Sequence, residues 1–398
     1  MLRPASRQML LIIFFLACGL ALWLGVILWN WSNAKGVVTL SAATDFTLAD
    51  CPRVSILIPA RNEAEILVSS LPRFLEQDYE NYEVILVDDA SSDGTAELIL
   101  QFSSRYPERL RALRVEELPP GWVGKIFALH TAFQAAQGEW VLATDADILF
   151  HPKALRAGLW QARRQQADLV SIFCFVECVS FWEKLLVPGF SLLIATFFPF
   201  RKNNDSGSSV AVASGGYILM RRRVWAELGG YEAIRSEMID DINTARLVKH
   251  SGHPICAVVT KDLLSTRMYQ DFQELWEGLR KNAFAAHHYS AARLLVAAGG
   301  ICLANLFPLV LLCYSAARLT VSGGGGWQLH AVLALSGAQY FLAVIQHLPV
   351  MIYFGISPWF ALLAPLGSIL YACISLDSMA RTLFGGGVSW KLRRYGRQ

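Results

Sequence analysis

Hydrophobic residues are distributed unevenly along the chain. The stretch from Met9 to Asn30 has no charged residue, and as a helix it is long enough to cross about 30 Å of hydrocarbon. Further apolar stretches lie in the last third of the chain, at 294–314, roughly 329–354 and 359–376. The middle one is interrupted by His347 and Pro349, which leaves its limits open. The pattern predicts one N-terminal and about three C-terminal transmembrane helices around a more polar block.

The first apolar stretch has two interpretations. Arg3 and Arg7 precede it and the small residues of 32–34 follow it, as in a secretory signal peptide with its cleavage site. Its apolar core is longer than the usual h-region of about 7–15 residues. Tryptophans also crowd its far end, as expected at a membrane interface. We therefore expect an uncleaved anchor.

The polar block alternates strand-like and helix-like runs, which suggests a mostly parallel sheet. Predicted strands lie at 54–58, 82–87 and 139–143, and predicted helices at 62–71, 96–100 and 125–136. Two successive strand–helix units with polar residues at the strand ends predict a nucleotide-binding half-sheet. The expected organisation is an anchor and linker at 1–44, a catalytic domain at 45–290, a transmembrane region at 291–380 and a basic tail at 381–398.

Composition supports a membrane part. Hydrophobic residues make up 54% of the chain and charged residues 17%, against roughly a quarter charged in ordinary soluble domains. The net charge of +3 is too small to imply a nucleic-acid partner. Cys174 and Cys178 lack a second metal-type pair, so a structural role is favoured over a zinc site.

Three pairs of aspartates are the candidates for chemistry. Asp145 and Asp147 follow the predicted strand at 139–143, and such hard oxygen ligands suit Mg²⁺ or Mn²⁺ together with substrate phosphates. Two carboxylates so close repel each other unless a cation or donors compensate. The pairs 88–89 and 240–241 could converge on the same crevice. For 88–89, helix capping is an equal alternative, and for Asp93 capping is the favoured role.

The segments that carry these aspartates resemble a known family. Val54 to Glu63, Val84 to Thr95 and Thr144 to Asp147 are similar, in order and spacing, to family 2 glycosyltransferases with the GT-A fold, over about residues 52–285. Gly121 to Lys125, Ser180 to Leu186 and Ile239 to Asp241 resemble the membrane-bound, hopanoid-associated members. The resemblance implies a Rossmann-like mixed α/β sheet. It also implies transfer of a sugar from a nucleoside diphosphate to an acceptor, commonly with inversion.

The resemblance implies specific roles on the donor side. Asp147 would bind Mg²⁺ or Mn²⁺, and Asp145 would hold the ribose or share the metal. Asp88 or Asp89 would contact the base, and the nucleotide pocket would be lined by Pro59, Arg61 and Glu63. Lys125 could meet a phosphate, although a solvated lysine at a helix end is the alternative.

On the acceptor side, the family places its general base at the second position of a Glu-Asp pair. Asp241 stands there, with Asp240 in place of the glutamate, and Asp241 is therefore the candidate base. Gly215 and Gly216 would let backbone approach a sugar. Arg280 keeps the arginine of a signature found in processive members, without its tryptophan. We expect it to contact diphosphate and do not expect long-polymer synthesis.

The acceptor is expected to be a membrane lipid. Phe181 to Phe200 is apolar, and forms either a buried helix broken at Pro188 or an interfacial hairpin at the bilayer. With the four apolar spans, this favours a hopanoid or other polycyclic alcohol, a polyprenyl phosphate, or a ceramide-type glycolipid as acceptor. His287 and His288 could face headgroups or be ordinary surface residues. A catalytically silent membrane scaffold is the non-enzyme alternative, and a transporter is disfavoured by the lack of an intramembrane charge pair.

The expected topology contains a conflict. Nucleotide sugars are cytosolic, so the catalytic domain should face the cytoplasm from the inner membrane. Four spans would then place both chain ends outside, although the positive-inside rule prefers basic ends inside. The basic residues concerned are Arg3 and Arg7 at the start and Lys391, Arg393, Arg394 and Arg397 in the tail. We give the need for a cytosolic nucleotide sugar to reach the catalytic domain precedence over the charge rule. The number of membrane crossings stays open.

Overall fold

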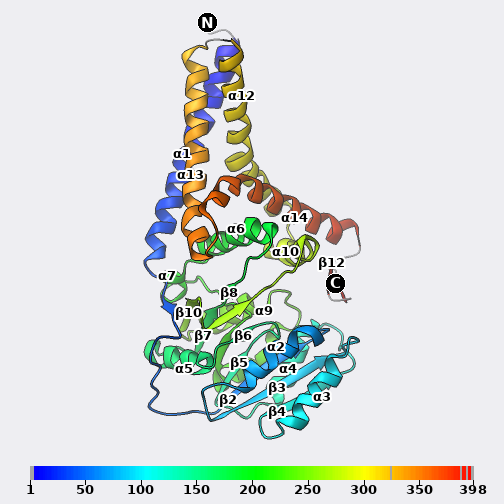
Figure 1. Cartoon of the computed structure of the whole chain (residues 1–398). Helices are drawn as coiled ribbons and strands as arrows, with labels where there is room; N and C mark the ends of the chain where they lie inside the picture. Colours follow the sequence, from blue (N-terminus) through cyan, green and yellow to red (C-terminus); the bar gives the residue numbers. More distant parts are fainter. Residues whose placement is uncertain (1–3, 323–324, 386–387, 391–392, 396–398) are drawn as a thin grey trace. The chain divides into compact units, whose positions relative to one another are not determined.

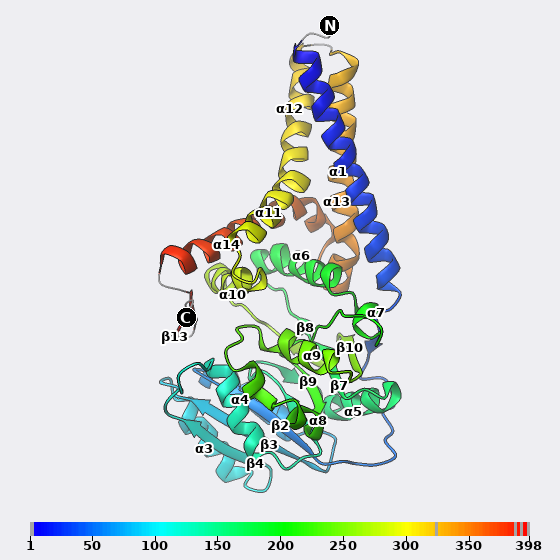
Figure 2. The same ribbon diagram turned by 180° about the vertical axis from the view of Figure 1, so that it is seen from behind.

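The computed structural model describes residues 4–322, 325–385, 388–390 and 393–395. The chain divides into two compact units, coloured along the sequence in Figures 1 and 2. The first comprises 1–32, 178–197 and 269–398, and the second 33–177 and 198–268. The predicted basic positions Arg3, Lys391 and Arg397 lie outside the described residues.

The second unit is built on an eight-stranded sheet with the order β1-β10-β7-β9-β5-β2-β3-β4. Its strand β9 runs antiparallel to both neighbours, β5 and β7, and the other pairs are parallel. The predicted mixed α/β sheet is thereby confirmed. The strands are β1 (Thr39–Leu40), β2 (Val54–Ala60), β3 (Tyr82–Asp89), β4 (Leu110–Val115), β5 (Trp140–Ala143), β7 (Leu169–Phe173), β9 (Ile218–Arg221) and β10 (Ile255–Thr260).

Alternate residues of the central strands pack into two hydrophobic cores on opposite faces of the sheet. Ile56 belongs to one core and its neighbour Leu57 to the other, as the two-residue period of a strand requires. A strand buried on both faces needs a nearly continuous apolar run, and this is why β2 and β3 were recognisable in the sequence. The first core is covered by α2 (Ala64–Leu75), α3 (Thr95–Arg105) and α5 (Ala154–Gln165), and the second by α4 (Gly124–Ala135), α8 (Arg222–Glu227), η1 (Gly230–Ile234) and α9 (Asp240–His250).

The three predicted strands and three predicted helices are present as β2, β3, β5, α2, α3 and α4. Asp93 has the capping role favoured from the sequence. Its Oδ1 accepts hydrogen bonds from the backbone N and Oγ1 of Thr95, at 3.1 and 2.5 Å, and its Oδ2 accepts from Ala64 N at 3.1 Å. One carboxylate therefore bonds amides at the first residues of both α2 and α3.

A small second sheet extends the loop that carries the D-x-D aspartates. It has the order β6-β11-β8 and consists of β6 (Leu149–Phe150), β11 (Leu264–Thr266) and β8 (Phe175–Val176). The short helix α7 (Phe200–Asn203) completes the unit. Because β6 begins two residues after Asp147, pairing with β11 fixes the path of the D-x-D loop.

The first unit consists of helices, with a short pair of strands at its C-terminal end. They are α1 (Pro4–Ala34), α6 (Phe181–Phe197), α10 (Phe272–Ala286), α11 (Ala291–Ile301), a π-helical turn η2 (Cys302–Leu306), α12 (Phe307–Ser322), α13 (Trp327–Tyr353), η3 (Pro358–Leu363), α14 (Ala364–Phe384), β12 (Val388–Trp390) and β13 (Arg393–Tyr395). Four helical stretches are long and apolar enough to cross a membrane, at Arg7–Ala34, Ala291–Val321, Trp327–Tyr353 and Pro358–Phe384. One N-terminal and three C-terminal candidates are thus present, as predicted.

Polar side chains link these apolar helices to one another. Trp23 Nε1 of α1 donates to the carbonyl of Ala304 at 3.2 Å, and the side-chain amide of Gln339 in α13 donates to the carbonyl of Leu16. Figures 1 and 2 both show α1 running beside α13. Such bonds satisfy polar groups that hydrocarbon could not.

The structure shows neither of the two forms expected for residues 181–200, a helix broken at Pro188 or a hairpin. Helix α6 runs without interruption from Phe181 to Phe197, with Pro188 in its interior. A proline there removes one backbone hydrogen bond, at a cost of about 3 kcal/mol. Burial of Leu185 to Pro188 offsets this cost, and a capping box stabilises the start of the helix. In that box Ser180 N donates to Glu183 Oε2 at 2.6 Å and Glu183 N to Ser180 Oγ at 3.2 Å.

Candidate active site

Three segments far apart in the sequence meet around the ammonium group of Lys125. This lysine is in the first turn of α4, and its Nζ lies 2.7 Å from Asp145 Oδ1 and 3.1 Å from Asp240 Oδ2. Asp145 follows β5, and Asp240 is the first residue of α9. The structure therefore brings together one aspartate of the D-x-D, the predicted phosphate lysine and the aspartate pair that holds the candidate base.

The charged groups of this cluster shift one another's pKa values. Burial alone would lower the pKa of Lys125, but Asp145 and Asp240 outweigh it and raise that pKa well above its usual value. Burial, reinforced by Asp240, raises the pKa of Asp241 to about 6, against the opposing charge of Lys125. A carboxylate that takes up a proton near neutral pH is suited to general-base catalysis.

The glycine pair closes around this cluster. Gly215 N donates to Asp241 Oδ2 at 3.1 Å, so the backbone orients the carboxylate. A Cβ on Gly215 would stand 3.0 Å from Asp145 Oδ2 and 3.2 Å from Lys125 Nζ. A Cβ on Gly216 would be as tightly placed, 3.1 Å from Ile148 Cδ1. Glycine at 215 leaves room for Asp145 and Lys125 to meet, and glycine at 216 leaves room for Ile148 and Cys174 beside the cluster.

Asp147 lies at the start of the small sheet. Its Oδ2 accepts a hydrogen bond from Thr266 Oγ1 at 3.1 Å, which ties the D-x-D loop to β11. Among the described residues, no group of three or more His, Cys, Asp or Glu side chains gathers as a metal site. A D-x-D that supplies two carboxylates fits a divalent cation that takes its remaining oxygens from a substrate diphosphate and water. The side chains present thus fit Mg²⁺ or Mn²⁺.

Cys174 and Cys178 behave as structural thiols. Neither forms a disulfide, and burial is the main cause that raises the pKa of each thiol to about 12. For Cys174 the charges of Asp147 and Asp145 add to the effect of burial. Protonated thiols are poor metal ligands, in keeping with the structural role favoured from the sequence.

The predicted nucleotide-binding residues lie at the adjacent ends of β2 and β3. These strands pair in parallel with Pro59 opposite Val87 and Ala60 opposite Asp88. Arg61 Nη1 donates to the backbone carbonyl of Asp89 at 2.5 Å. Side chains also connect the two loops, since Asn62 N donates to Ser91 Oγ at 3.0 Å and Ser92 N to Asn62 Oδ1 at 2.9 Å. The structure brings Pro59, Arg61, Glu63, Asp88 and Asp89 to one edge of the sheet.

Asp88 holds the loop that follows its own strand. Its Oδ1 accepts from Ser91 N at 3.2 Å, and its buried Oδ2 lies 3.5 Å from Nε of Arg114. Sequence reasoning missed Arg114, which stands opposite Asp88 in the register of β3 and β4. The segment Leu110–Val115 lacks a two-residue alternation, since its arginines stand three positions apart, so periodicity gave no signal for this edge strand.

Arg280 lies in the first unit, whereas the aspartate pairs lie in the second. It is buried in α10, and its Nη1 lies 3.2 Å from Asp377 Oδ2, which also accepts from Trp276 Nε1 at 2.9 Å. Arg381 Nε contacts Asp377 Oδ1 at 3.1 Å. Asp377 thus joins α10 to α14. The diphosphate contact expected of Arg280 stays a prediction.

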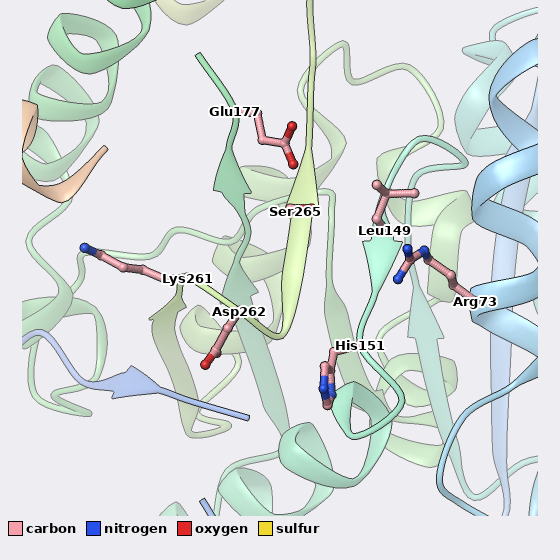
Figure 3. Close-up of a pocket in the computed structure, with 7 residues that line it drawn as sticks. All are labelled: Arg73, Leu149, His151, Glu177, Lys261, Asp262 and Ser265. Carbon is pink, nitrogen blue, oxygen red and sulfur yellow. The ribbon is translucent and has the colours of Figure 1, made fainter. Parts of the chain in front are cut away.

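A separate cavity of about 250 Å³ opens in the second unit (Figure 3). It is lined by Arg73, Leu149, His151, Glu177, Lys261, Asp262 and Ser265, and none of these is a predicted site residue. Successive residues of a strand point to opposite faces, so Ser265 faces away from the side on which Thr266 meets Asp147. The cavity is therefore distinct from the aspartate cluster.

The mixed sheet with antiparallel β9, together with a D-x-D directly after β5, defines a GT-A-like α/β fold. Residues 55–229 match the family model described as Glycosyl transferase family 2, so this part of the chain is a family 2 glycosyltransferase domain.

Comparison with known proteins gives the same class. The putative glycosyltransferase EpsE of Bacillus subtilis is 26% identical over 198 residues, which cover 48% of this chain and 65% of EpsE. The 4,4'-diaponeurosporenoate glycosyltransferase of Staphylococcus haemolyticus is 24% identical over 232 residues, covering 58% of this chain and 60% of the relative. The chain thus spans less than two thirds of either relative.

A solved structure shares the fold over nearly the whole chain. It is the mannosyltransferase PcManGT from Pyrobaculum calidifontis in complex with GDP-Man and Mn²⁺, with a TM-score of 0.54 and 19% identity. The match covers 94% of this chain and 99% of the mannosyltransferase. At this identity the likeness establishes the fold alone.

Proposed function

We propose that this protein is a membrane-bound inverting glycosyltransferase that moves a sugar from a nucleoside-diphosphate donor to a lipid acceptor. The observation that carries the proposal is the convergence of Asp145, Lys125 and Asp240–Asp241 at the end of β5 in a family 2 domain. Such a site offers a cation-binding D-x-D, a cation for phosphate and a carboxylate base together.

On the donor side, the ends of β2 and β3 with Arg61 and Asp89 would hold the nucleoside, and Asp145 and Asp147 the diphosphate end. Mg²⁺ or Mn²⁺, held by Asp147 with Asp145, would supply positive charge against the departing diphosphate. Lys125 would add a second positive charge at a phosphate oxygen. The mannosyltransferase with the same fold forms a complex with GDP-Man and Mn²⁺, which supports this assignment.

On the acceptor side, Asp241 would take the proton of the acceptor hydroxyl. The acceptor oxygen bonds to the anomeric carbon as the bond from that carbon to the phosphate oxygen breaks, and the nucleoside diphosphate leaves with the bonding electrons. Because attack comes from the face opposite the leaving group, the anomeric configuration inverts. Gly215 N donates to Asp241 Oδ2 at 3.1 Å and Ile242 N donates to Asp241 Oδ1 at 2.7 Å, which fixes the carboxylate and leaves each oxygen a further lone pair.

A lipid acceptor is supported by the helical unit. Its four candidate spans leave large apolar side chains exposed, among them Phe14 of α1 at 61% and Trp359 of η3 at 77%. Exposed apolar side chains on long helices are suited to contact with the hydrocarbon of a bilayer. One relative also carries its acceptor in its name, 4,4'-diaponeurosporenoate. A hopanoid or related polycyclic alcohol fits the subgroup resemblance, with the enzyme in the cytoplasmic membrane and its catalytic domain facing the cytoplasm.

The proposal is tested with purified protein in detergent. We expect release of UDP or GDP from one member of a panel of nucleotide sugars when Mg²⁺ or Mn²⁺ and a membrane lipid extract are present. Mass spectrometry should find a lipid heavier by one glycosyl unit. Absence of turnover with every donor and lipid fraction, from protein that still binds nucleotide, would contradict the enzyme assignment and favour a silent scaffold.

The pH dependence should reflect Asp241. Its pKa of about 6 predicts that kcat/KM rises with pH up to roughly 6 and is level above it, since only the carboxylate accepts a proton. The charged groups around it are Asp240, Lys125 and Asp145. Since the folded-state pKa lies above the unfolded value, the same group should lower the free energy of unfolding as pH rises from about 4 to 6. A rate profile without an acidic limb near pH 6 would count against Asp241 as base.

A further inference from the structure

The ammonium of Lys125 already occupies the position of a cation between two carboxylates. It lies 2.7 Å from Asp145 and 3.1 Å from Asp240, so a single charge bridges the D-x-D loop and the start of α9. The carboxylate of Asp240 is 16% exposed and that of Asp145 36%. Partly desolvated like charges repel strongly unless a cation compensates them.

In the donor-free protein, the surroundings hold the ammonium of Lys125 between Asp145 and Asp240. Asp145 Oδ2 and Lys125 Nζ both lie within 3.2 Å of where a Gly215 Cβ would be, so the backbone leaves just enough space for the pair. Lys125 also lies beside Asp145, at the expected diphosphate end of the donor. An ammonium that bridges two carboxylates attracts a phosphate less strongly than one released from Asp145, because the nearby carboxylate also repels the phosphate.

We infer that Lys125 is an exchangeable counter-cation of this site, which partly offsets the charges of Asp145 and Asp240 in the free protein and moves to the donor diphosphate when a divalent metal takes Asp145. The inference rests on the proposed function and adds to it an exchange of cations. A lysine suits this task because its compact charge sits on a flexible four-carbon stem.

The exchange has a thermodynamic consequence. Metal alone must displace Lys125 from Asp145, and the ammonium then keeps Asp240 but loses one of its two carboxylate partners. Metal together with a nucleoside diphosphate offers that ammonium a phosphate oxygen. Metal and nucleotide should therefore each strengthen the binding of the other, and the strengthening must be reciprocal.

The test is Mn²⁺ binding, followed by the loss of the free-ion signal in electron paramagnetic resonance, with and without UDP or GDP. In the unmodified protein we expect weak binding of Mn²⁺ alone, and binding about tenfold or more tighter with nucleotide. In Lys125→Met, Mn²⁺ alone should bind about tenfold tighter than in the unmodified protein, and nucleotide should add little. Lys153→Met is the matched control, because Lys153 Nζ donates to the Ala42 carbonyl instead of a carboxylate.

Two results would overturn the inference. One is Lys125→Met binding Mn²⁺ alone no tighter than the unmodified protein, and the other is undiminished coupling between Mn²⁺ and nucleotide in that variant. Lys125→Gln, which retains a hydrogen-bond donor, replaces Lys125→Met if thermal unfolding shows that the methionine variant does not fold. Failure of the proposed function is distinguishable, since it would leave the Mn²⁺ exchange as expected while no nucleotide sugar turns over.

Discussion

Replacing Asp241 with asparagine should lower kcat by about 10²–10⁴-fold, the range typical of a lost general base. The amide is nearly isosteric and can still accept the hydrogen bond from Gly215 N. It cannot accept a proton from the acceptor hydroxyl, so the chemical step is lost while the fold and the donor site remain. The dissociation constant for nucleotide should therefore change little.

The measurement is nucleoside-diphosphate release with saturating donor and lipid, beside the thermal unfolding of each protein. Asp205→Asn is a suitable control, since the exposed Asp205 accepts a hydrogen bond from Gly207 N in a loop and an asparagine can do the same. Substantial activity in Asp241→Asn would contradict a hydroxyl acceptor. It would favour a polyprenyl phosphate, whose anionic oxygen attacks without a strong base.

Much of the sheet could be predicted because its central strands are buried on both faces. The continuous apolar runs of β2, β3 and β5 are visible in the sequence for that reason. Periodicity does not reveal strand β9, because the four residues Ile218–Arg221 are too few to show a period. Its antiparallel place between β5 and β7 is set by pairing with residues 47 to 81 positions away in the sequence.

The residues of the candidate site could be predicted from the sequence, but the contacts between them could not. The aspartates, Lys125 and the glycine pair were recognised from motifs, each within a few residues. The ion pair from Lys125 to Asp240 spans 115 positions and the bond from Gly215 to Asp241 spans 26. Local sequence carries no signal for such contacts. The raised pKa of Asp241 depends on burial and on Asp240, and the burial is known only after folding.

In the first, helical unit, the sequence likewise predicted the elements but not the contacts between them. The number and approximate positions of the candidate spans followed from hydropathy, whereas the continuity of α6 through Pro188 depends on tertiary packing that offsets a local penalty. Arg280 drew attention as part of a phosphate signature. Its nearest carboxylate in the structure is Asp377, 97 positions later, which no motif connects to it.

Replacing Asp147 with asparagine should reduce turnover by about 100-fold or more at any Mn²⁺ concentration, because it removes the anionic ligand expected to hold the metal at the leaving diphosphate. Donor binding should become insensitive to Mn²⁺ and to EDTA, which titration calorimetry with and without metal can measure. Thr266→Val is the matched control. It removes the hydroxyl that donates to Asp147 Oδ2 at 3.1 Å and keeps the carboxylate, so metal dependence should persist with at most a modest loss of rate. Unchanged Mn²⁺ dependence in Asp147→Asn would contradict Asp147 as ligand and shift that role to Asp145.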